Sequence, residues 1–381
     1  MKVYLDNAAT TPIDENVLES MLPYMRDSYG NPSSIHSHGR EVRSAIEQSR
    51  KKVAELLNTS PSEIFFTSGG TEADNMALCS TIESHGIQHV ITSKLEHHAV
   101  LHTVEYLEKV KNVKVSYVKV DRKGNIDFSH FENLLKGNSK SLVSLMHGNN
   151  EIGNILDLSK TGDLCSEYGA ILHSDTVQTV GHYKHDLEVL KTDFIVGSAH
   201  KFHGPKGVGF LYINANTKIS PYIHGGAQER NMRGGTENVY GIVGLAKALE
   251  IAYSDMQDHR KYVLGLKQKM IYGLKSELED IAFNGDSEDV QNSLYTVLNV
   301  CLPKTTDNDM LLFNLDINQI SASAGSACSS GSSLGSHVLQ AIGSDPNRGA
   351  VRFSFSKYNT EEEINYVVEK LANIFKPEKA V

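Results

Sequence analysis

The chain has 381 residues, of which 40% are hydrophobic and 22% are charged, a composition typical of a soluble globular protein with about two or three domains. The 46 Asp and Glu residues outnumber the 37 Lys and Arg residues, and the net charge of −9 argues against a protein that binds nucleic acid. The four cysteines are too few for a disulfide scaffold and predict free thiols in a reducing compartment. They are Cys79, Cys165, Cys301 and Cys328.

The N-terminal segment MKVYLDNAATTP lacks the apolar core of a signal peptide. No stretch approaches the about 18 consecutive apolar residues that a membrane span requires. We therefore expect a cytoplasmic protein without a membrane partner.

Apolar residues with helical spacing and short apolar runs alternate along the first part of the chain. Strands are predicted at 63–68, 89–93, 113–120, 141–147, 170–175, 192–198 and 206–214. Helices are predicted at 39–57, around 100–110, at 128–135 and at 158–169. A further helix is predicted to follow the GGTEADN segment and to continue through Leu78. This alternation predicts βαβ units, and the continuous apolar strands predict a mainly parallel sheet covered on both faces.

After about residue 236 the pattern changes to long helical stretches at 239–256 and 259–278. A smaller α+β part follows, with strands near 294–302 and 351–356 and a last helix that starts with the capping-box residues Thr360 and Glu363. We predict a large domain at 13–256 and a small domain at 257–381. The segment 1–12 could pack on either.

Polar residues gather where the predicted strands end, which is where ligands bind in open α/β sheets. The segment Ser68-Gly69-Gly70-Thr71-Glu72 joins a strand to a helix, so it could hold an anion at the helix N-terminus. The simpler reading is a tight turn with Thr71 as the N-cap. The segment is neither a Walker A motif nor a G-x-G-x-x-G motif.

Asp175 and Lys201 stand at the ends of successive predicted strands. Enzymes that use pyridoxal 5'-phosphate (PLP) need a Schiff-base lysine and usually an acidic partner for the pyridine nitrogen. An anion-binding turn, a strand-end Asp and a strand-end Lys, in that order, fit the aspartate-aminotransferase-like fold.

Two further residues have a functional and a plain interpretation. Cys328 lies in the small, polar segment SASAGSACSSGSS, which predicts a mobile loop that carries either a functional thiol or an incidental one. His97 follows the strand at 89–93 and could stack on a cofactor ring and move protons, or merely cap a helix. No histidine pair has the spacing of a metal site, so we predict no metal.

Together these segments resemble, in order and over nearly the whole chain, the class I (NifS/IscS-like) cysteine desulfurases, which are fold-type I PLP-dependent enzymes. The resemblance implies a large α/β domain with a mainly parallel sheet and a smaller α+β domain. It rests on YLDNAATTP, GNPSSIHSHGR, FTSGGTEADN, LEHHAV, HGNNEIG, HSDTVQTVG, GSAHKFHGPKG, RGGTEN, SAGSACSSGS and VRFSFS.

The resemblance implies catalytic roles for three residues: Lys201 bonds covalently to PLP, His97 stacks on its ring, and Cys328 becomes the persulfide. It also implies a set of cofactor-binding residues, which are Asp175 for the pyridine nitrogen, Gln178 for the phenolic oxygen, and Gly70, Thr71, Ser198 and His200 for the phosphate.

Substrate and partner follow from the same resemblance. Arg352, helped by Asn31 and Asn150, would hold the carboxylate of L-cysteine, because a guanidinium donates two parallel hydrogen bonds. Thr236 would bind the phosphate of the neighbouring subunit, which implies a homodimer.

The implied reaction converts L-cysteine to L-alanine and passes sulfur to Cys328, for iron–sulfur cluster assembly or thiolation through a sulfur-acceptor protein. A selenocysteine lyase or cysteine-sulfinate desulfinase is the nearest alternative, and a non-catalytic sulfur-trafficking scaffold is a second one. Two features depart from the family pattern: Ala199 stands where Gly is common, and the chain ends soon after IFKPEKAV, which bears on how an acceptor docks.

Overall fold

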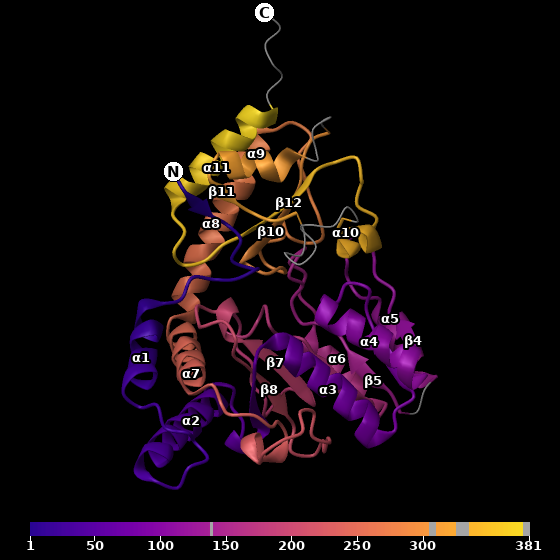
Figure 1. Cartoon of the computed structure of the whole chain (residues 1–381). Coiled ribbons are helices and arrows are strands. Elements are labelled where there is room, and N and C mark those ends of the chain that lie inside the picture. The colour runs from indigo at the N-terminus through magenta and orange to yellow at the C-terminus, as the bar shows by residue number, and fades with distance from the viewer. Residues whose placement is uncertain (138–139, 305–309, 325–334, 376–381) are drawn as a thin grey trace, which may run out of the picture.

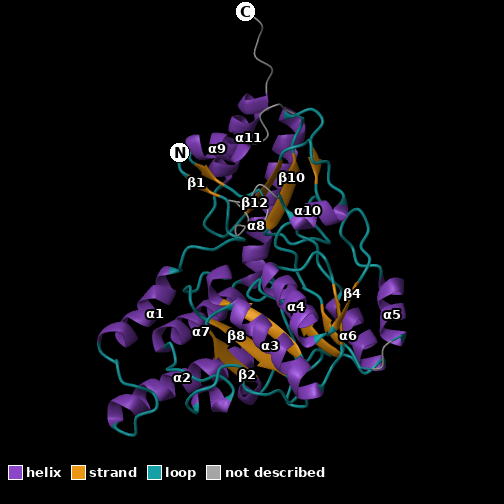
Figure 2. Ribbon diagram, turned by 45° about the vertical axis from the view of Figure 1, so that its right-hand side comes forward, coloured by secondary structure: helices purple, strands orange, loops and turns teal. Residues whose placement is uncertain are grey.

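The computed structural model describes residues 1–137, 140–304, 310–324 and 335–375. Two units lie one above the other, and a long helix, α8 (Met256–Glu277), runs from one into the other (Figure 1). The lower unit contains the large sheet and its helices, and the upper unit contains both ends of the described chain (Figures 1 and 2).

The large sheet has seven strands in the order β2-β8-β7-β6-β5-β3-β4. They are Ile64–Thr67 (β2), His89–Thr92 (β3), Lys114–Tyr117 (β4), Leu142–Ser144 (β5), Ile171–Ser174 (β6), Phe194–Ser198 (β7) and Gly209–Ile213 (β8). The pairs from β4 to β7 are all parallel, which confirms the prediction of a mainly parallel sheet. Strand β8 is antiparallel to both neighbours, because the connection from Ser198 to Gly209 is too short for a crossover helix.

Helices cover both faces of this sheet. They are Glu15–Arg26 (α1), Ser37–Leu56 (α2), Gly70–His85 (α3), His98–Lys111 (α4), Phe128–Lys136 (α5), Leu158–Glu167 (α6) and Val239–Ser254 (α7). Successive side chains of a strand point to opposite faces. Accordingly, Phe194 packs with α3, while its neighbour Ile195 packs with α2 and α7. This two-sided burial explains why the strands are continuously apolar.

The upper unit is built on smaller sheets. Strands Val297–Cys301 (β10), Ala350–Ser354 (β12) and Ala282–Phe283 (β9) form an antiparallel sheet in the order β12-β10-β9. The helices packed around it are α8, Leu311–Ile317 (α9) and Glu361–Phe375 (α11), whereas His337–Ile342 (α10) packs its buried side chains with Leu95 and Ile152. The predicted capping box at α11 is confirmed, since Thr360 N donates to Glu363 Oε2 at 3.0 Å and Glu363 N donates to Thr360 Oγ1 at 3.2 Å.

The N-terminal segment packs on the upper unit. Strand β1 (Val3–Tyr4) pairs in parallel with β11 (Ile320–Ser321). We call the buried cluster of this unit the C-terminal core; it comprises apolar side chains within 263–278, 295–302, 311–320, 351–355 and 364–371, with Val3 and Leu5. The domain boundary near residue 256 stays a prediction, and Asp255 separates α7 from α8 at that point.

Short 3-10 helices complete the described structure at Pro61–Glu63 (η1), Ala199–Lys201 (η2) and Gln228–Asn231 (η3). No helix in the described part of the chain is long and apolar enough to cross a membrane.

Candidate active site

A cavity with an empty volume of about 820 Å³ lies at the carboxyl ends of the parallel-oriented strands, below the upper unit. Residues that follow β2, β3, β5, β6 and β7 line it, as expected for an open α/β sheet. Its walls include ten of the residues predicted for the site: Gly70, Thr71, His97, Asn150, Asp175, Gln178, Ser198, His200, Lys201 and Arg352.

One end of the cavity is the N-terminus of α3. The helix begins at Gly70, with Gly69 as the N-cap and no capping side chain, so the reading of Thr71 as the N-cap is wrong. The first amide groups of a helix lack intrahelical acceptors and attract anions. A Cβ atom added to Gly70 would lie 2.8 Å from Val177 Cγ2, so glycine is needed for this close packing.

A negative side chain beside this helix N-terminus is neutralised by a nearby cation. Glu72 accepts hydrogen bonds from Arg233 at 2.8 and 3.1 Å and from the Ser68 amide at 2.9 Å. These hydrogen bonds lower the pKa of the Glu72 carboxyl against the opposing effect of burial. A phosphate group at the α3 N-terminus would therefore lie near a carboxylate, Glu72, whose negative charge is balanced by Arg233.

Asp175 follows β6 directly and is 4% exposed. Its Oδ1 accepts the Val177 amide at 2.9 Å. Burial raises its pKa, while the Val177 hydrogen bond and the charge of Lys201 act in the opposite direction. A cation placed at this carboxyl group, such as a protonated pyridine nitrogen, would stabilise its ionised form.

A second carboxyl group, which the sequence analysis missed, lines the same cavity. Asp74 lies in α3 and is 1% exposed, and its pKa is raised by burial first, then by the charges of Asp175 and Glu96. His173 Nε2 lies 3.2 Å from Asp74 Oδ1, but the angle is not that of a hydrogen bond, and neither atom has a hydrogen-bond partner. A helical step of four residues from Gly70 puts Asp74 on the same face, which is the signal that could have found it.

His97 caps a helix, and its predicted stacking on a cofactor ring stays a prediction. It lines the cavity, and it caps α4 because its Nδ1 accepts the Ala99 amide at 3.1 Å. Burial and the charge of Lys201 lower its pKa to about 4, so the ring is neutral at pH 7. With Nδ1 acting as an acceptor, the ring proton is on Nε2.

Lys201 lies at the end of η2, immediately after β7. Its Nζ donates to the carbonyl oxygens of Ala8 at 2.7 Å and Ala9 at 2.8 Å. Gln178 Nε2 also donates to Ala8 O, at 3.0 Å. The N-terminal segment therefore forms part of the site, a contribution that was not predicted from the strand ends.

Arg352 enters the cavity from β12 of the upper unit and is 1% exposed. Its Nη2 lies 2.7 Å from Asp6 Oδ1, its Nη1 donates to Asn150 O at 3.0 Å, and its Nε has no hydrogen-bond partner. A buried guanidinium with an unused donor is suited to an anionic ligand.

Three predicted site residues are not in this cavity. Asn31 is exposed in the segment before α2, where its Oδ1 accepts the Ser33 amide at 2.9 Å. Thr236 lines a different cavity, beside Glu229 and Arg233. Cys328 lies outside the described residues.

The described cysteines have environments unlike that of a reactive thiol. Cys165 and Cys301 are buried, and Cys79, which belongs to α3, is partly buried against apolar side chains that include those of α4. Burial raises the pKa of all three thiols, that of Cys79 to about 11. None of them lines the cavity that contains Lys201.

The cavity fits PLP in the chemistry of its donors. The α3 N-terminus with Ser198 and His200 would hold the phosphate, Asp175 would face the pyridine nitrogen, and Lys201 brings an amine to the same cavity. No group of three or more His, Cys, Asp and Glu residues within 1–137, 140–304, 310–324 and 335–375 is arranged to hold a metal ion.

Comparisons with known proteins agree with this geometry. The family model described as aminotransferase class-V matches residues 3–367. A protein of Dictyoglomus turgidum named cysteine desulfurase IscS is 42% identical over 378 residues, which are 98% of this chain and 94% of that protein.

Solved structures show the same likeness. A NifS-like protein superposes with a TM-score of 0.90 at 40% identity, over 98% of this chain and 99% of its own. A structure titled SspA in complex with cysteine has a TM-score of 0.81 at 33% identity, over 94% of this chain and 100% of its own. The chain thus belongs to the aminotransferase class-V family and, within it, to the NifS- and IscS-like cysteine desulfurases.

Proposed function

We propose that this protein is a PLP-dependent cysteine desulfurase that converts L-cysteine to L-alanine and transfers the sulfur to Cys328 as a persulfide. The observation that carries the proposal is that Lys201, Asp175 and Arg352 line one cavity. Relatives named cysteine desulfurase and a similar structure solved with cysteine support it.

PLP, when bound, supplies a sink for the electron pair left at the substrate Cα. Asp175 would hold the pyridine nitrogen in its protonated form through a buried carboxylate. Lys201, within the cavity and beside Ala8 and Ala9, is placed to take the Cα proton. His97, neutral at pH 7 with its proton on Nε2, would stack on the ring and could exchange a proton with the substrate.

The substrate carboxylate is expected at Arg352. The Asp6 and Asn150 contacts orient the guanidinium, and its Nε remains to donate to the carboxylate. This contact would place the substrate Cα at a defined distance from Lys201, which converts binding energy into orientation.

Sulfur transfer is assigned to Cys328. The thiolate is the reactive form of cysteine, and buried thiols with raised pKa values are inert. The raised pKa values of Cys79, Cys165 and Cys301 disfavour these three as sulfur acceptors.

We also propose that the enzyme is a homodimer. Thr236 lies outside the cavity of its own chain and is exposed, as its implied role toward the neighbouring subunit requires, and Asn31 is exposed as well. Large apolar side chains near Asn31 are unusually exposed, with Ile35 at 90% and Tyr29 at 76%, and a partner subunit would bury them. The sulfur would then pass to an acceptor protein, such as an iron–sulfur scaffold, in the reducing environment of the cytoplasm.

The decisive experiment incubates the PLP-loaded protein with L-cysteine and measures both L-alanine and the persulfide on Cys328. Equal formation of the two on the first turnover supports the proposal. Cys328→Ser should form no persulfide and release no sulfide, whereas the control Cys301→Ser should keep both. Full turnover by Cys328→Ser, or activity only with selenocysteine or cysteine sulfinate, would contradict the proposal and support the nearest alternatives.

A further inference from the structure

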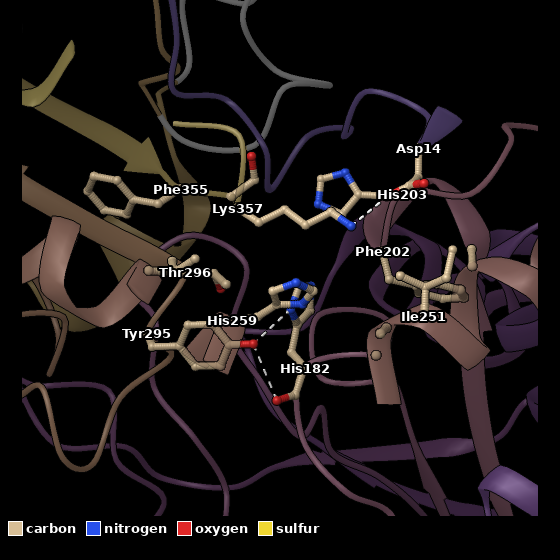
Figure 3. Close-up of a pocket in the computed structure, with 15 residues that line it drawn as sticks. Asp14, His182, Phe202, His203, Ile251, His259, Tyr295, Thr296, Phe355 and Lys357 are labelled. Atoms are coloured by element: carbon tan, nitrogen blue, oxygen red, sulfur yellow. Dashed lines mark hydrogen bonds and ion pairs between the residues drawn. The ribbon is translucent and has the colours of Figure 1, made fainter. Parts of the chain in front are cut away.

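A second, smaller cavity is lined by the helices α7 and α8, the C-terminal core and the segments that contain His182 and His203 (Figure 3). His182, His203, His259 and Lys357 bring ionisable groups to its walls. Its empty volume of about 460 Å³ is little more than half that of the active-site cavity. Hydrogen bonds along its wall reach the backbone of Lys201.

A chain of two hydrogen bonds passes along this cavity and ends on the lysine (Figure 3 shows the first of them). The hydroxyl of Tyr295 lies 3.1 Å from His182 Nδ1, and His182 Nε2 lies 3.1 Å from the carbonyl oxygen of Lys201. A carbonyl oxygen only accepts, so His182 Nε2 carries a proton. In the neutral ring Nδ1 is then an acceptor, and the Tyr295 hydroxyl donates to it at 3.1 Å, with a longer contact of 3.4 Å from the same hydroxyl to the His182 carbonyl oxygen.

The protonation state that this chain needs agrees with its surroundings. Burial lowers the pKa of His182 to about 4, with the Lys201 carbonyl acting in the opposite direction and His259 adding to the decrease. Burial also lowers the pKa of His203 to about 4, and Lys357 is paired with Asp14 at 2.6 Å. At neutral pH the His182 ring is uncharged and holds one tautomer.

The chain connects parts of the protein that are far apart in sequence. Tyr295 is 3% exposed and belongs to the C-terminal core. His182 follows the Asp175 turn after β6, and Lys201 follows β7. A shift of the C-terminal core relative to the sheet would change the Tyr295–His182 contact and, through it, the support of the lysine backbone.

The segment that carries Lys201 is restrained on both sides. The side chain of Lys201 bonds to the carbonyl oxygens of Ala8 and Ala9, and its own carbonyl oxygen accepts from His182. Two residues later His203 has φ +66°, a conformation that non-glycine residues rarely adopt, and its amide donates to Thr11 Oγ1 at 2.8 Å. Such a backbone needs external contacts to hold it.

We propose that His182 is a positioning residue for Lys201 and that Tyr295 orients His182. Together they would keep Lys201 in a fixed position relative to the C-terminal core. This inference rests on the proposed function in so far as Lys201 is the lysine that bonds to PLP. Arg352 also comes from the upper unit, so the same contacts would fix Lys201 relative to the site of the substrate carboxylate.

The test compares the full-length PLP-loaded enzyme with Tyr295→Phe, which removes only the hydroxyl. We expect kcat for L-cysteine to fall about tenfold with KM within about twofold, since a misplaced reacting group slows chemistry more than binding. The pH midpoint of the visible absorption band of the bound cofactor should shift as well. Tyr183→Phe is the matched control, because its hydroxyl contacts the Ser293 carbonyl and the Tyr295 amide and not His182.

His182 is tested with two variants. His182→Gln retains an N–H that can reach the Lys201 carbonyl and should restore most of the activity, whereas His182→Leu should lose it with an unchanged PLP content. If Tyr295→Phe and the His182 variants keep the wild-type kcat and absorption midpoint, the inference is overturned. A wild-type enzyme that binds PLP but does not consume L-cysteine would instead refute the proposed function, and the absorption midpoints would still test His182.

Discussion

The carboxyl group of Asp74 shares the wall of the active-site cavity with Asp175, and the charge of Asp175 adds to burial in raising the pKa of Asp74. Glu96, also buried, has a raised pKa for the same reasons and an Oε2 without a hydrogen-bond partner. Neutral acids beside Asp175 would leave one negative charge at the pyridine-nitrogen end of the site.

This arrangement predicts that Asp74→Asn stabilises the cofactor-free protein at neutral pH. A carboxyl whose folded pKa is raised binds its proton more tightly in the folded state, so its contribution to stability falls as pH rises above the unfolded pKa of about 4. The melting temperature of the variant relative to wild type should increase by about 1–2 °C between pH 4 and pH 7, the equivalent of ~1 kcal/mol for a chain of 381 residues. Thermal unfolding at both pH values measures it.

The matched control is Asp163→Asn, which changes an exposed carboxyl that pairs with Lys191 at the surface. It should show no such pH-dependent difference. A loss of stability in Asp74→Asn that is equal at both pH values would show that Asp74 is ionised in the folded protein.

The assignment of Lys201 predicts that Lys201→Ala loses the covalent link to PLP. The visible absorption of the protein should change to that of free or non-covalently held cofactor, and borohydride should no longer fix PLP to the chain. Absorption spectra and mass spectrometry of the reduced protein measure this. Lys206→Ala, in the exposed segment that follows, is the control and should keep the wild-type spectrum; a wild-type spectrum from Lys201→Ala would disprove the assignment.

Arg352→Lys retains a positive charge but loses the planar fork that binds a carboxylate. We expect KM for L-cysteine to increase about tenfold or more, since Lys has no counterpart of the Nε donor and a hydrogen bond to a charged group is worth ~1.5–3 kcal/mol. The cofactor spectrum without substrate should stay as in wild type. An unchanged KM in steady-state assays would place the substrate carboxylate elsewhere.

The buried ion pair between Arg50 and Glu229 should be important for stability. Arg50 donates to both carboxylate oxygens of Glu229 at 2.8 and 2.9 Å, and Glu229 Oε2 also accepts the Phe66 amide at 2.9 Å. Removing one partner of a buried pair typically costs ~3–5 kcal/mol. Denaturant unfolding should therefore give a strongly lowered free energy of unfolding for Glu229→Gln, whereas Asp163→Asn should change that free energy by less than ~1 kcal/mol; equal effects would contradict the prediction.

Much of the site was predictable because its residues come from local patterns. Asp175, Lys201 and the Gly69–Gly70 turn each follow a recognisable strand, and parallel strands bring their carboxyl ends to one edge of a sheet. The capping box of α11 was predictable for a similar reason, since its two residues are three positions apart.

Other features depend on contacts that no local pattern reports. The sequence did not show that β8 runs antiparallel, that Asp74 turns toward the cavity, or that Ala8 and Ala9 cover Lys201. The contact of Asp6 with Arg352 joins the two ends of the chain across 346 residues, and Tyr295 contacts His182 across 113 residues.

By itself, then, the sequence determined the order of the strand-end motifs, the alternation of strands and helices, and through its resemblance the family and its chemistry. Only the tertiary structure decided which carboxyl groups share the cavity, which backbone atoms hold the lysine, and that Asn31 and Thr236 lie outside the site of their own chain. The physical reason is range: periodicity and caps act over a few residues, whereas burial, ion pairing and pKa depend on neighbours that the folded chain brings together from distant positions.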